Sequence, residues 1–178
     1  MSGGPAATAL VGVWPAWQRV LHWALAASVI TALVVHEGGP WHEATGWLAL
    51  GLALVRSLLG FVGPPAARFS AFVRGPRETL GYAQQVLSGH APRQLNHNPL
   101  GAVMVVVLLG MVVLAGASGW LYTTDRFWGE GWVILLHAVC AWPLVGLAAL
   151  HVGGVWHASR AHGENLVAAM WHGRKRAE

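Results

Sequence analysis

Long runs of apolar residues, separated by short polar stretches, dominate the sequence. Four of these runs cover residues 17–36, 41–62, 98–122 and 131–157. A helix that crosses a membrane needs about 20 mainly apolar residues, and each run meets that length. Only four residues separate the first two runs, which forces the corresponding helices to lie antiparallel. The pattern predicts an all-α integral membrane protein whose domain, residues 17–158, is a bundle of four transmembrane helices.

The composition agrees with a surface that faces lipid. Hydrophobic residues make up 55% of the 178 residues, and charged residues only 10%. Soluble domains carry about 25% charged residues, so a soluble fold of this length would lack the polar side chains to cover its surface. The first apolar run contains His22 and Trp23, and no clear small-residue cleavage site follows it. We therefore expect this run to be retained and not removed as a signal peptide.

The basic residues predict how the bundle is oriented. Of the eleven Lys and Arg residues, ten fall on one side of the four-helix arrangement and Arg126 alone falls on the other. Because basic residues stay on the cytoplasmic side of a membrane, we expect a bacterial inner-membrane protein with cytoplasmic termini. The connection at 63–97 is predicted to be cytoplasmic too. Residues 1–16 are predicted to be a flexible tail, and residues 159–178 a basic cytoplasmic tail.

The polar connections add two local predictions and exclude one class of partner. The formal charge of +4 does not indicate nucleic acid, because no stacking groups or base-reading motif accompany the basic residues. Pro76 can begin a short amphipathic helix that ends near Leu87 and lies on the inner membrane surface, although a solvated loop fits the same residues. Asn98 and Pro99 form a favourable cap and first position for the third long helix.

Two histidines in the last apolar run indicate chemistry inside the membrane. His137 and His151 lie fourteen residues apart in a stretch, 131–156, that contains no Asp, Glu, Lys or Arg. At about 1.5 Å and 100° per residue, they occupy nearly the same helix face at two depths about 21 Å apart. Ala141 and Ala148 lie between them on that face; such small residues leave room for a flat macrocycle but also serve close helix packing. Imidazoles are strong axial ligands of haem iron, so the spacing favours two stacked b haems.

The partner of each histidine follows from its depth in the bundle. His22 lies at the cytoplasmic level of His151, and the two are predicted to hold an inner haem. At the outer level of His137, both His36 and His42 are candidates, since His36 repeats the fourteen-residue spacing from His22. The face that begins at His42 carries mainly small residues, namely Gly46, Ala49, Ala53, Arg56 and Gly60. This stripe favours His42 as the outer ligand.

Two arginines are candidates for contacts with the haem. Arg56 lies well inside a predicted helix, and both Arg56 and Arg19 are suited to bind a propionate at the inner level. Equally, both side chains can extend to inner-leaflet phosphates. The single Cys140 excludes a Cys-x-x-Cys-His attachment site, so any haem is held without thioether links. The remaining histidines are assigned interfacial or solvated roles: His90, His97, His157, His162 and His172.

Motifs spread along the chain beyond residue 16 are similar to those of one family of membrane cytochromes. In order, they are Arg19-Val20-Leu21-His22-Trp23, His42-x3-Gly46 with Arg56, Gly60-Phe61-Val62-Gly63, Ala67-Arg68-Phe69-Ser70 with Gly75-Pro76-Arg77, His97-Asn98-Pro99-Leu100-Gly101, His137, His151, and His162-Gly163-Glu164-Asn165-Leu166-Val167-x2-Met170 with Gly173-Arg174-Lys175-Arg176. The set resembles the bacterial cytochrome b561 family. More closely, it resembles the b-type cytochrome subunit of nickel–iron hydrogenases and related cytochrome b/b6-domain proteins.

The resemblance implies a four-helix membrane bundle with two b haems held by His22, His42, His137 and His151. It also implies electron exchange between a quinone pool and a redox partner on the outer side. Hydrogenase cytochromes usually have a fifth helix or longer loops that grip the hydrogenase, and this chain has neither. We therefore expect a periplasmic cytochrome c or another redox protein as the partner, rather than a hydrogenase.

Two further functions use the same features differently. The first is oxidation of superoxide, or of another small reductant, with transfer of the electrons to quinone. A basic funnel on the outer side would be expected for that anion, and the outer loops offer only Arg126 among acidic residues. The second is a haem-free anchor or metal transporter. No carboxylate lies deep within an apolar run to bind a cation, which counts against a transporter.

Overall fold

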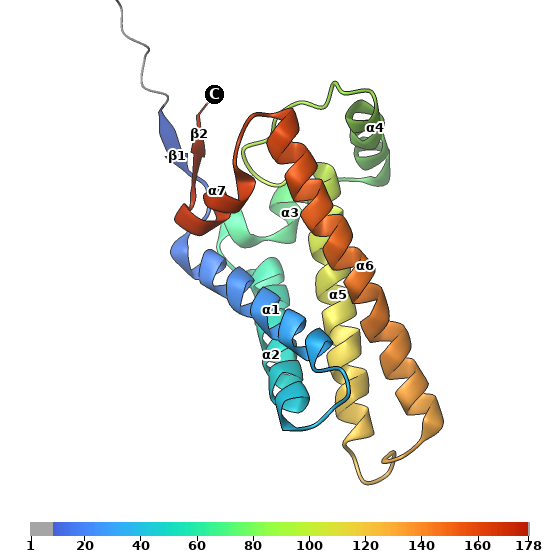
Figure 1. Cartoon of the computed structure of the whole chain (residues 1–178). Helices are drawn as coiled ribbons and strands as arrows, with labels where there is room; N and C mark the ends of the chain where they lie inside the picture. The colour runs from blue at the N-terminus through green and yellow to red at the C-terminus, as the bar shows by residue number, and fades with distance from the viewer. Residues whose placement is uncertain (1–8, 178) are drawn as a thin grey trace, which may run out of the picture.

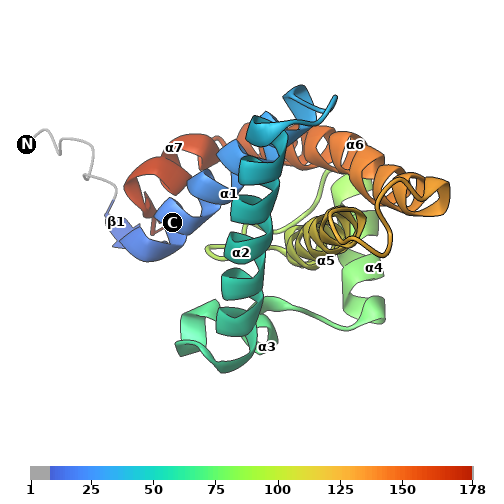
Figure 2. The ribbon, with the colours of Figure 1, turned by 90° about the horizontal axis from the view of Figure 1, so that it is seen from below.

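Four long helices form the body of the molecule in the computed structural model, which describes residues 9–177. They are α1 (Ala16–Val34), α2 (Pro40–Val62), α5 (Pro99–Tyr122) and α6 (Gly131–Ala161). Helix α1 packs on α2, α2 on α5, and α5 on α6, as Figures 1 and 2 show. The predicted all-α class is confirmed.

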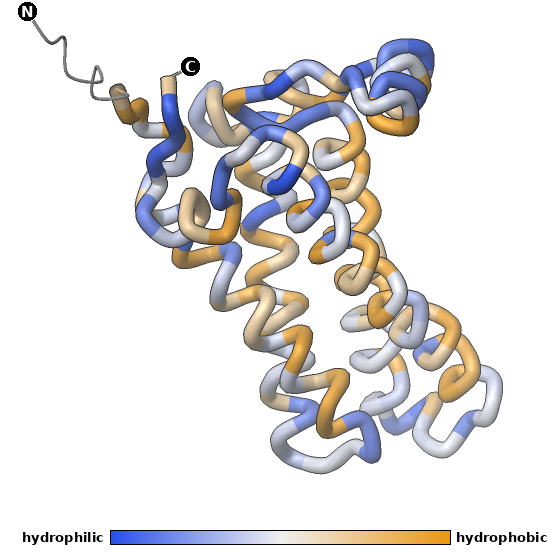
Figure 3. Tube along the Cα trace, turned by 45° about the horizontal axis from the view of Figure 1, so that its top comes forward, coloured by the Kyte–Doolittle hydropathy of each residue, from blue (hydrophilic) through white to orange (hydrophobic). Residues whose placement is uncertain are grey.

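Three of these helices are long and apolar enough to cross a membrane. Within the described residues they are α2, α5 and α6, which correspond to the last three of the four predicted spans. Helix α1 has 19 residues and is not among them, because Gln18, Arg19 and His22 lower the hydropathy of its first turns. Large apolar side chains remain exposed along the long helices, as expected where the surroundings are lipid. Figure 3 shows apolar residues along these helices and polar residues concentrated at the two ends.

The helix ends follow local rules that the sequence makes visible. The side chain of Asn98 accepts a hydrogen bond of 2.7 Å from the amide of Gly101, and Pro99 occupies the first turn of α5. This cap agrees with the prediction. Helix α2 begins at Pro40 after Gly39, whose φ of 90° suits glycine. Helix α6 continues to Ala161 although Pro143, inside it, has no amide proton to donate.

The core of the bundle is narrow and consists of small and aliphatic side chains. One cluster of buried residues joins α2, α5 and α6: Ala49, Ala53, Leu109, Val112, Ala115, Cys140 and Leu144. Cys140 is a buried free thiol, in agreement with a packing role.

The connection between α2 and α5 is helical and not an open loop. It contains a 3-10 turn at Pro65–Ala67, α3 (Phe69–Phe72) and α4 (Pro76–Leu87). Of the two predictions for the residues that follow Pro76, a short helix or a solvated loop, the structure shows the helix. Tyr82 is the buried residue of α4, and the helix packs beside α5, apart from α1 and α2 (Figure 2). Leu87 is 88% exposed, so the apolar face of α4 is only partly covered by the protein.

The two ends of the described chain meet in a small cap. Strand β1 (Leu10–Gly12) pairs antiparallel with β2 (Arg174–Arg176), and α7 (Leu166–His172) precedes β2. The carbonyl of Gly173, whose φ is +81°, accepts hydrogen bonds from the amides of Val13 and Trp14 at 2.8 and 3.1 Å. The structure thus differs from the flexible tail expected at 1–16, because strand pairing holds residues 10–12. Residues 1–8 lie outside the described part of the chain.

Glu164 is the centre of an ion-pair cluster in this cap. Its carboxylate accepts a hydrogen bond of 2.9 Å from Arg93 and lies 3.8 Å from the ammonium of Lys175. The amide of Arg176 donates to it at 3.2 Å. Burial opposes the ionisation of Glu164, but these partners outweigh burial and hold the pKa of the carboxyl below its ordinary value. The cluster ties β2 to the loop that precedes α5.

Candidate cofactor site

Two pairs of histidine rings face each other across the bundle. The rings of His22 on α1 and His151 on α6 lie 6.3 Å apart between centroids, with 57° between their planes. The rings of His42 on α2 and His137 on α6 lie 5.9 Å apart, with 83° between their planes. Helix α6 therefore contributes one ring to each pair, and α1 and α2 supply the opposite rings. The structure brings together the same four residues that the sequence pairs by depth.

These separations suit one iron atom between each pair of rings. A bond from a metal to an imidazole nitrogen is about 2 Å long. Two such bonds on opposite sides of one haem iron place the ring centres about 6 Å apart. Both measured distances are close to this value. Within residues 9–177, no group of three or more His, Cys, Asp or Glu side chains converges as a bare metal ion would require.

The pair formed by His42 and His137, called the outer pair after the predicted orientation, is held by hydrogen bonds to the backbone. Nδ1 of His42 lies 3.1 Å from the carbonyl oxygen of Ala32, and Nδ1 of His137 lies 3.0 Å from that of Ala115. A carbonyl accepts only a protonated nitrogen, so the proton of each ring is on Nδ1 and Nε2 keeps its lone pair. Such contacts are typical around metal-bound histidines, because they fix both the tautomer and the ring orientation.

Two residues of α5 that the sequence did not single out shape the environment of His137. The hydroxyl of Ser118 lies 3.2 Å from Nδ1 of His137. Gly119 leaves space for the ring, since a Cβ at this position would lie 3.2 Å from Cε1 of His137. Neither residue carries a signal in the sequence, because Ser and Gly are also common wherever membrane helices pack closely.

His36 does not belong to the outer pair. Helix α1 ends at Val34, so His36 lies beyond the helix and no longer follows the helical phase of His22. Its exposed ring makes an edge contact with Trp142 at 5.6 Å. In this structure the ring that faces His137 is therefore that of His42, and not that of His36. One turn after His42, Gly46 is half-buried and nothing lies within 4 Å of its Cβ position, so this face has room for a flat ligand.

One comparison with known proteins identifies a family for this chain. The model of the prokaryotic cytochrome b561 family matches residues 13–173. The chain belongs to the prokaryotic cytochrome b561 family. It is therefore a membrane b-type cytochrome of electron transfer and binds haem b. Searches of curated proteins and of solved structures found no match.

In this cytochrome b561, Arg56 is a buried cation without a carboxylate partner among the described residues. Its side chain is 7% exposed, and its Nη1 donates a hydrogen bond of 3.2 Å to the carbonyl of Ala67. The guanidinium carbon lies 5.4 Å from the centre of the Phe69 ring. Burial argues against extension to lipid phosphates and favours an anionic ligand, because an unpaired buried charge is costly.

Unlike Arg56, Arg19 contacts α7 and the cap. Its Nη1 donates to the carbonyl of Trp171 and so holds α7 against α1. The side chain packs against Gly173, where a Cβ would lie 3.1 Å from Nε of Arg19. Arg19 therefore already serves the cap, and its geometry does not single it out as a haem contact.

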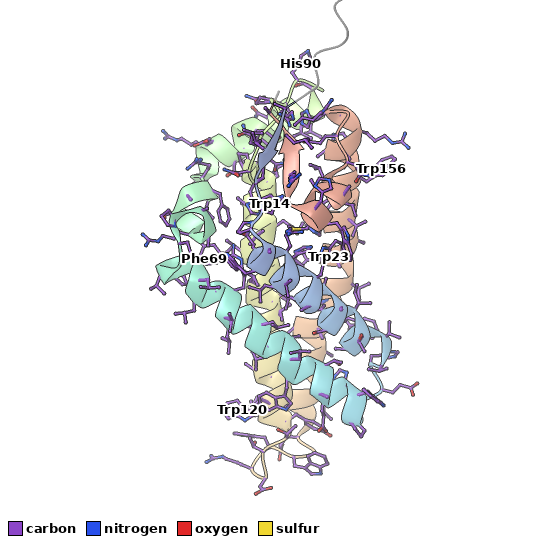
Figure 4. All side chains as sticks on the ribbon, turned by 90° about the vertical axis from the view of Figure 1, so that its left-hand side faces the viewer. Trp14, Trp23, Phe69, His90, Trp120 and Trp156 are labelled. Atoms are coloured by element: carbon purple, nitrogen blue, oxygen red, sulfur yellow. The ribbon has the colours of Figure 1, made fainter. Side chains whose placement is uncertain are left out.

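His97 is half-buried at the end of the bundle. It was predicted to be interfacial or solvated, whereas its ring lies between Phe72 at 4.5 Å and Trp14 at 4.7 Å. Burial lowers the pKa of His97 to about 4, with further contributions from Arg56, Lys175, His22 and His151 in that order. His97 is therefore neutral at physiological pH. Figure 4 labels Trp14, Trp23 and Phe69 around this end of the bundle. In the sequence, the motif His97-Asn98-Pro99 marks this position, but it does not indicate how far the ring of His97 is covered by its neighbours.

Proposed function

We propose that this cytochrome b561 carries electrons across a bacterial inner membrane through two haems. His22 and His151 hold the inner haem, and His42 and His137 hold the outer haem. One observation carries the proposal: two facing imidazole pairs, at 6.3 and 5.9 Å, lie at two levels of one bundle. When bound, each haem supplies a reversible one-electron couple between ferric and ferrous iron.

The residues of the chain supply ligation, orientation and charge. A haem iron held by two imidazoles would have no open position for oxygen chemistry. The carbonyls of Ala32 and Ala115 bind Nδ1 of the outer rings, so Nε2 of each ring would be free to hold a haem iron. At the inner level, Arg56 supplies a positive charge for a propionate, and neutral His97 lies beside it. The surrounding helices exclude water and thereby strengthen these interactions.

We infer the orientation from length and charge. Helix α1 is the fourth span, since its 19 residues extend about 28 Å. The basic residues of the cap and of the 63–97 connection make that end cytoplasmic. The proposed partners are the quinone pool in the membrane and a periplasmic redox protein, a cytochrome c rather than a hydrogenase.

Haem stoichiometry tests this function directly. Protein purified with its cofactor is expected to contain two haems per chain, measured by the pyridine haemochrome assay against protein concentration. A redox titration in membranes is expected to resolve two one-electron steps. A single haem per chain, or one step in the titration, contradicts the di-haem arrangement.

A further inference from the structure

Helix α4 lies crosswise at the end of the bundle where α5 begins. Figure 1 shows α4 nearly end-on while the long helices are seen from the side, and Figure 2 shows α4 from the side and α5 nearly end-on. Tyr82 of α4 and Pro99, the first residue of α5, line the same pocket. Helix α4 is therefore level with the first turn of α5 and runs across the axis of the bundle.

That level is the boundary of the bilayer. Helix α5 is one of the helices apolar enough to cross a membrane, and its 24 residues extend about 36 Å. The hydrocarbon core of a bilayer is about 30 Å thick, so both ends of α5 reach the headgroup regions. A helix that lies crosswise beside Pro99 is therefore in the plane of the interface, where amphipathic helices bind membranes.

The side chains of α4 divide into an apolar and a polar face. Leu80, Ala83 and Leu87 recur at spacings of three and four residues and therefore share one face. Leu80 is 65% exposed and Leu87 is 88% exposed, so the protein leaves this face uncovered. Glu78 and Gln85 lie on the opposite side and are exposed too. Figure 3 shows the polar positions of α4 on its upper side and the apolar positions on its lower side, toward the membrane-spanning part of the bundle.

Arginines accompany the apolar face at the start of the helix. Arg77 borders it, is exposed, and forms no salt bridge with any of the described residues. Arg74 pairs with Glu78 at 3.5 Å, but an exposed pair of this kind is weak. Between residues 63 and 90, Glu78 is the only acidic residue against three arginines, Arg68, Arg74 and Arg77. This charge is complementary to the negative surface of the cytoplasmic leaflet.

We infer that α4 binds anionic phospholipid at the surface of the membrane. Leu80 and Leu87 pack against the acyl chains, and Arg77 binds a headgroup phosphate, for which a guanidinium offers two parallel N–H donors. The leucines supply affinity for any bilayer, whereas the arginine supplies the preference for a negative one. The inference uses the placement of the bundle in a membrane and does not depend on the haems.

Spin labels on α4 test the depth of its two faces. Leu80→Cys, Leu87→Cys and Gln85→Cys each provide one labelling position in the full chain. A Cys140→Ala background removes the single native thiol. In nanodiscs, the labels at 80 and 87 are expected to collide mainly with oxygen, which concentrates in lipid, and the label at 85 mainly with a nickel chelate, which stays in water. If the chelate reaches all three labels equally, the apolar face lies in water and the inference is overturned.

Hydrogen exchange of the unlabelled protein tests the preference for negative lipid. The amides of α4 are expected to exchange more slowly in phosphatidylglycerol nanodiscs than in phosphatidylcholine nanodiscs, because bound lipid stabilises the helix. One arginine near an anionic surface contributes a factor of about five, so Arg77→Gln should reduce the ratio of the two rates about fivefold.

Arg174→Gln is the matched control for this measurement. Arg174 is an exposed arginine at the same end of the bundle, but it belongs to β2. Its substitution is expected to leave the ratio of the two exchange rates in α4 unchanged. Equal exchange of α4 in the two lipids, or an equal reduction of the ratio in Arg77→Gln and Arg174→Gln, overturns the assignment of anionic lipid to Arg77.

The same samples separate this inference from the proposed function. Haem content and both redox steps are expected to be unchanged in Arg77→Gln, because α4 (Pro76–Leu87) contains no histidine. A protein that purifies without haem, with the labels at 80 and 87 in lipid, contradicts the proposed function and supports the inference. Two haems per chain, with α4 in water, give the reverse result.

Discussion

The two histidine pairs lie in different surroundings, and the difference indicates how each is controlled. At the outer level, backbone carbonyls of α1 and α5 fix the rings of His42 and His137. At the inner level, no hydrogen bond to a ring nitrogen of His22 or His151 is found in the described structure, and the charges of Arg56 and Lys175 act on the neighbouring His97. The backbone thus sets ring orientation at the outer level, whereas at the inner level no such hydrogen bond holds the rings and His97 lies near the buried cation Arg56. Ligation, burial and charge are the main means by which a protein tunes a haem potential.

Removal of a ligand gives the largest expected effect on this comparison. His137→Ala and His151→Ala are each expected to lower the haem content from two per chain to one, because a single imidazole holds haem much less firmly. In a redox titration, His137→Ala should still show the one-electron step of the inner haem. His151→Ala should still show the step of the outer haem. His36→Ala is the matched control and should retain both haems. If instead His36→Ala loses one haem and His42→Ala loses none, the outer pair is wrongly assigned.

Removal of the positive charge of Arg56 should change the reduction potential of the inner haem alone. In Arg56→Leu, the positive charge that favours the additional electron of the ferrous state is lost, so the inner potential is expected to fall. A charge about 10 Å away at an effective dielectric constant of about 20 corresponds to about 70 mV. Arg56→Lys keeps the charge and should shift the potential less. A redox titration in which both haems shift equally contradicts the inner location of Arg56.

The cap that covers the inner level should open when its carboxylate is neutralised. Glu164→Gln removes charge-assisted hydrogen bonds to Arg93 and Arg176 and is expected to destabilise the pairing of β1 with β2 by about 1.5–3 kcal/mol. Hydrogen exchange should accelerate accordingly at the amides of Val13 and Ala177, which donate across the two ends of the chain. Amides within α5 serve as the internal control. Equal acceleration in α5 would indicate a general loss of stability.

The same cluster predicts the direction of a pH effect. Because the pKa of Glu164 is lower in the folded protein, its contribution is present above the ordinary pKa of 4.5 and is lost as the pH falls through the lowered value. Exchange at Val13, corrected for its intrinsic rate, should therefore stay constant from neutral pH to about 4.5 and rise below it. Glu164→Gln should show no such rise. A rise that begins near neutral pH would point to another group.

The smallest expected effect concerns the room around His137. Gly119→Ala adds a methyl group 3.2 Å from Cε1 of His137, so the ring must shift by a few tenths of an ångström. We expect the potential of the outer haem to change by less than that of the inner haem in Arg56→Leu, with both haems retained. Gly110→Ala is the control on the same helix, because nothing lies within 4 Å of its Cβ position. An equal shift in both variants would mean that contact with His137 is not the cause.

The sequence predicts best those features that depend on one helix at a time. The fourteen residues from His137 to His151 stay on one continuous helix, so the two rings keep their phase. The same spacing from His22 to His36 is misleading, because α1 ends at Val34. Helical periodicity holds only as far as the helix, and the end of α1 carries no clear stop signal before Gly38.

Features that arise from contacts between distant segments could not be predicted. The ring contacts of His97 require Trp14 from the start of the chain and Phe72 from α3. The pairing of β1 with β2 joins residues more than 160 positions apart through backbone groups that every residue carries. The roles of Ser118 and Gly119 depend on the side of α5 that faces His137. No local pattern encodes these neighbours.

The pairing of β1 with β2 also has a consequence for the order of biosynthesis. Strand β1 leaves the ribosome before any of the long helices, whereas its partner follows all four of them. The cap therefore cannot close until the bundle has been made and inserted. Until then the polar end of the bundle next to His22 and His151 lacks its cover, so a ligand of these residues has an interval in which it could enter before the cap closes.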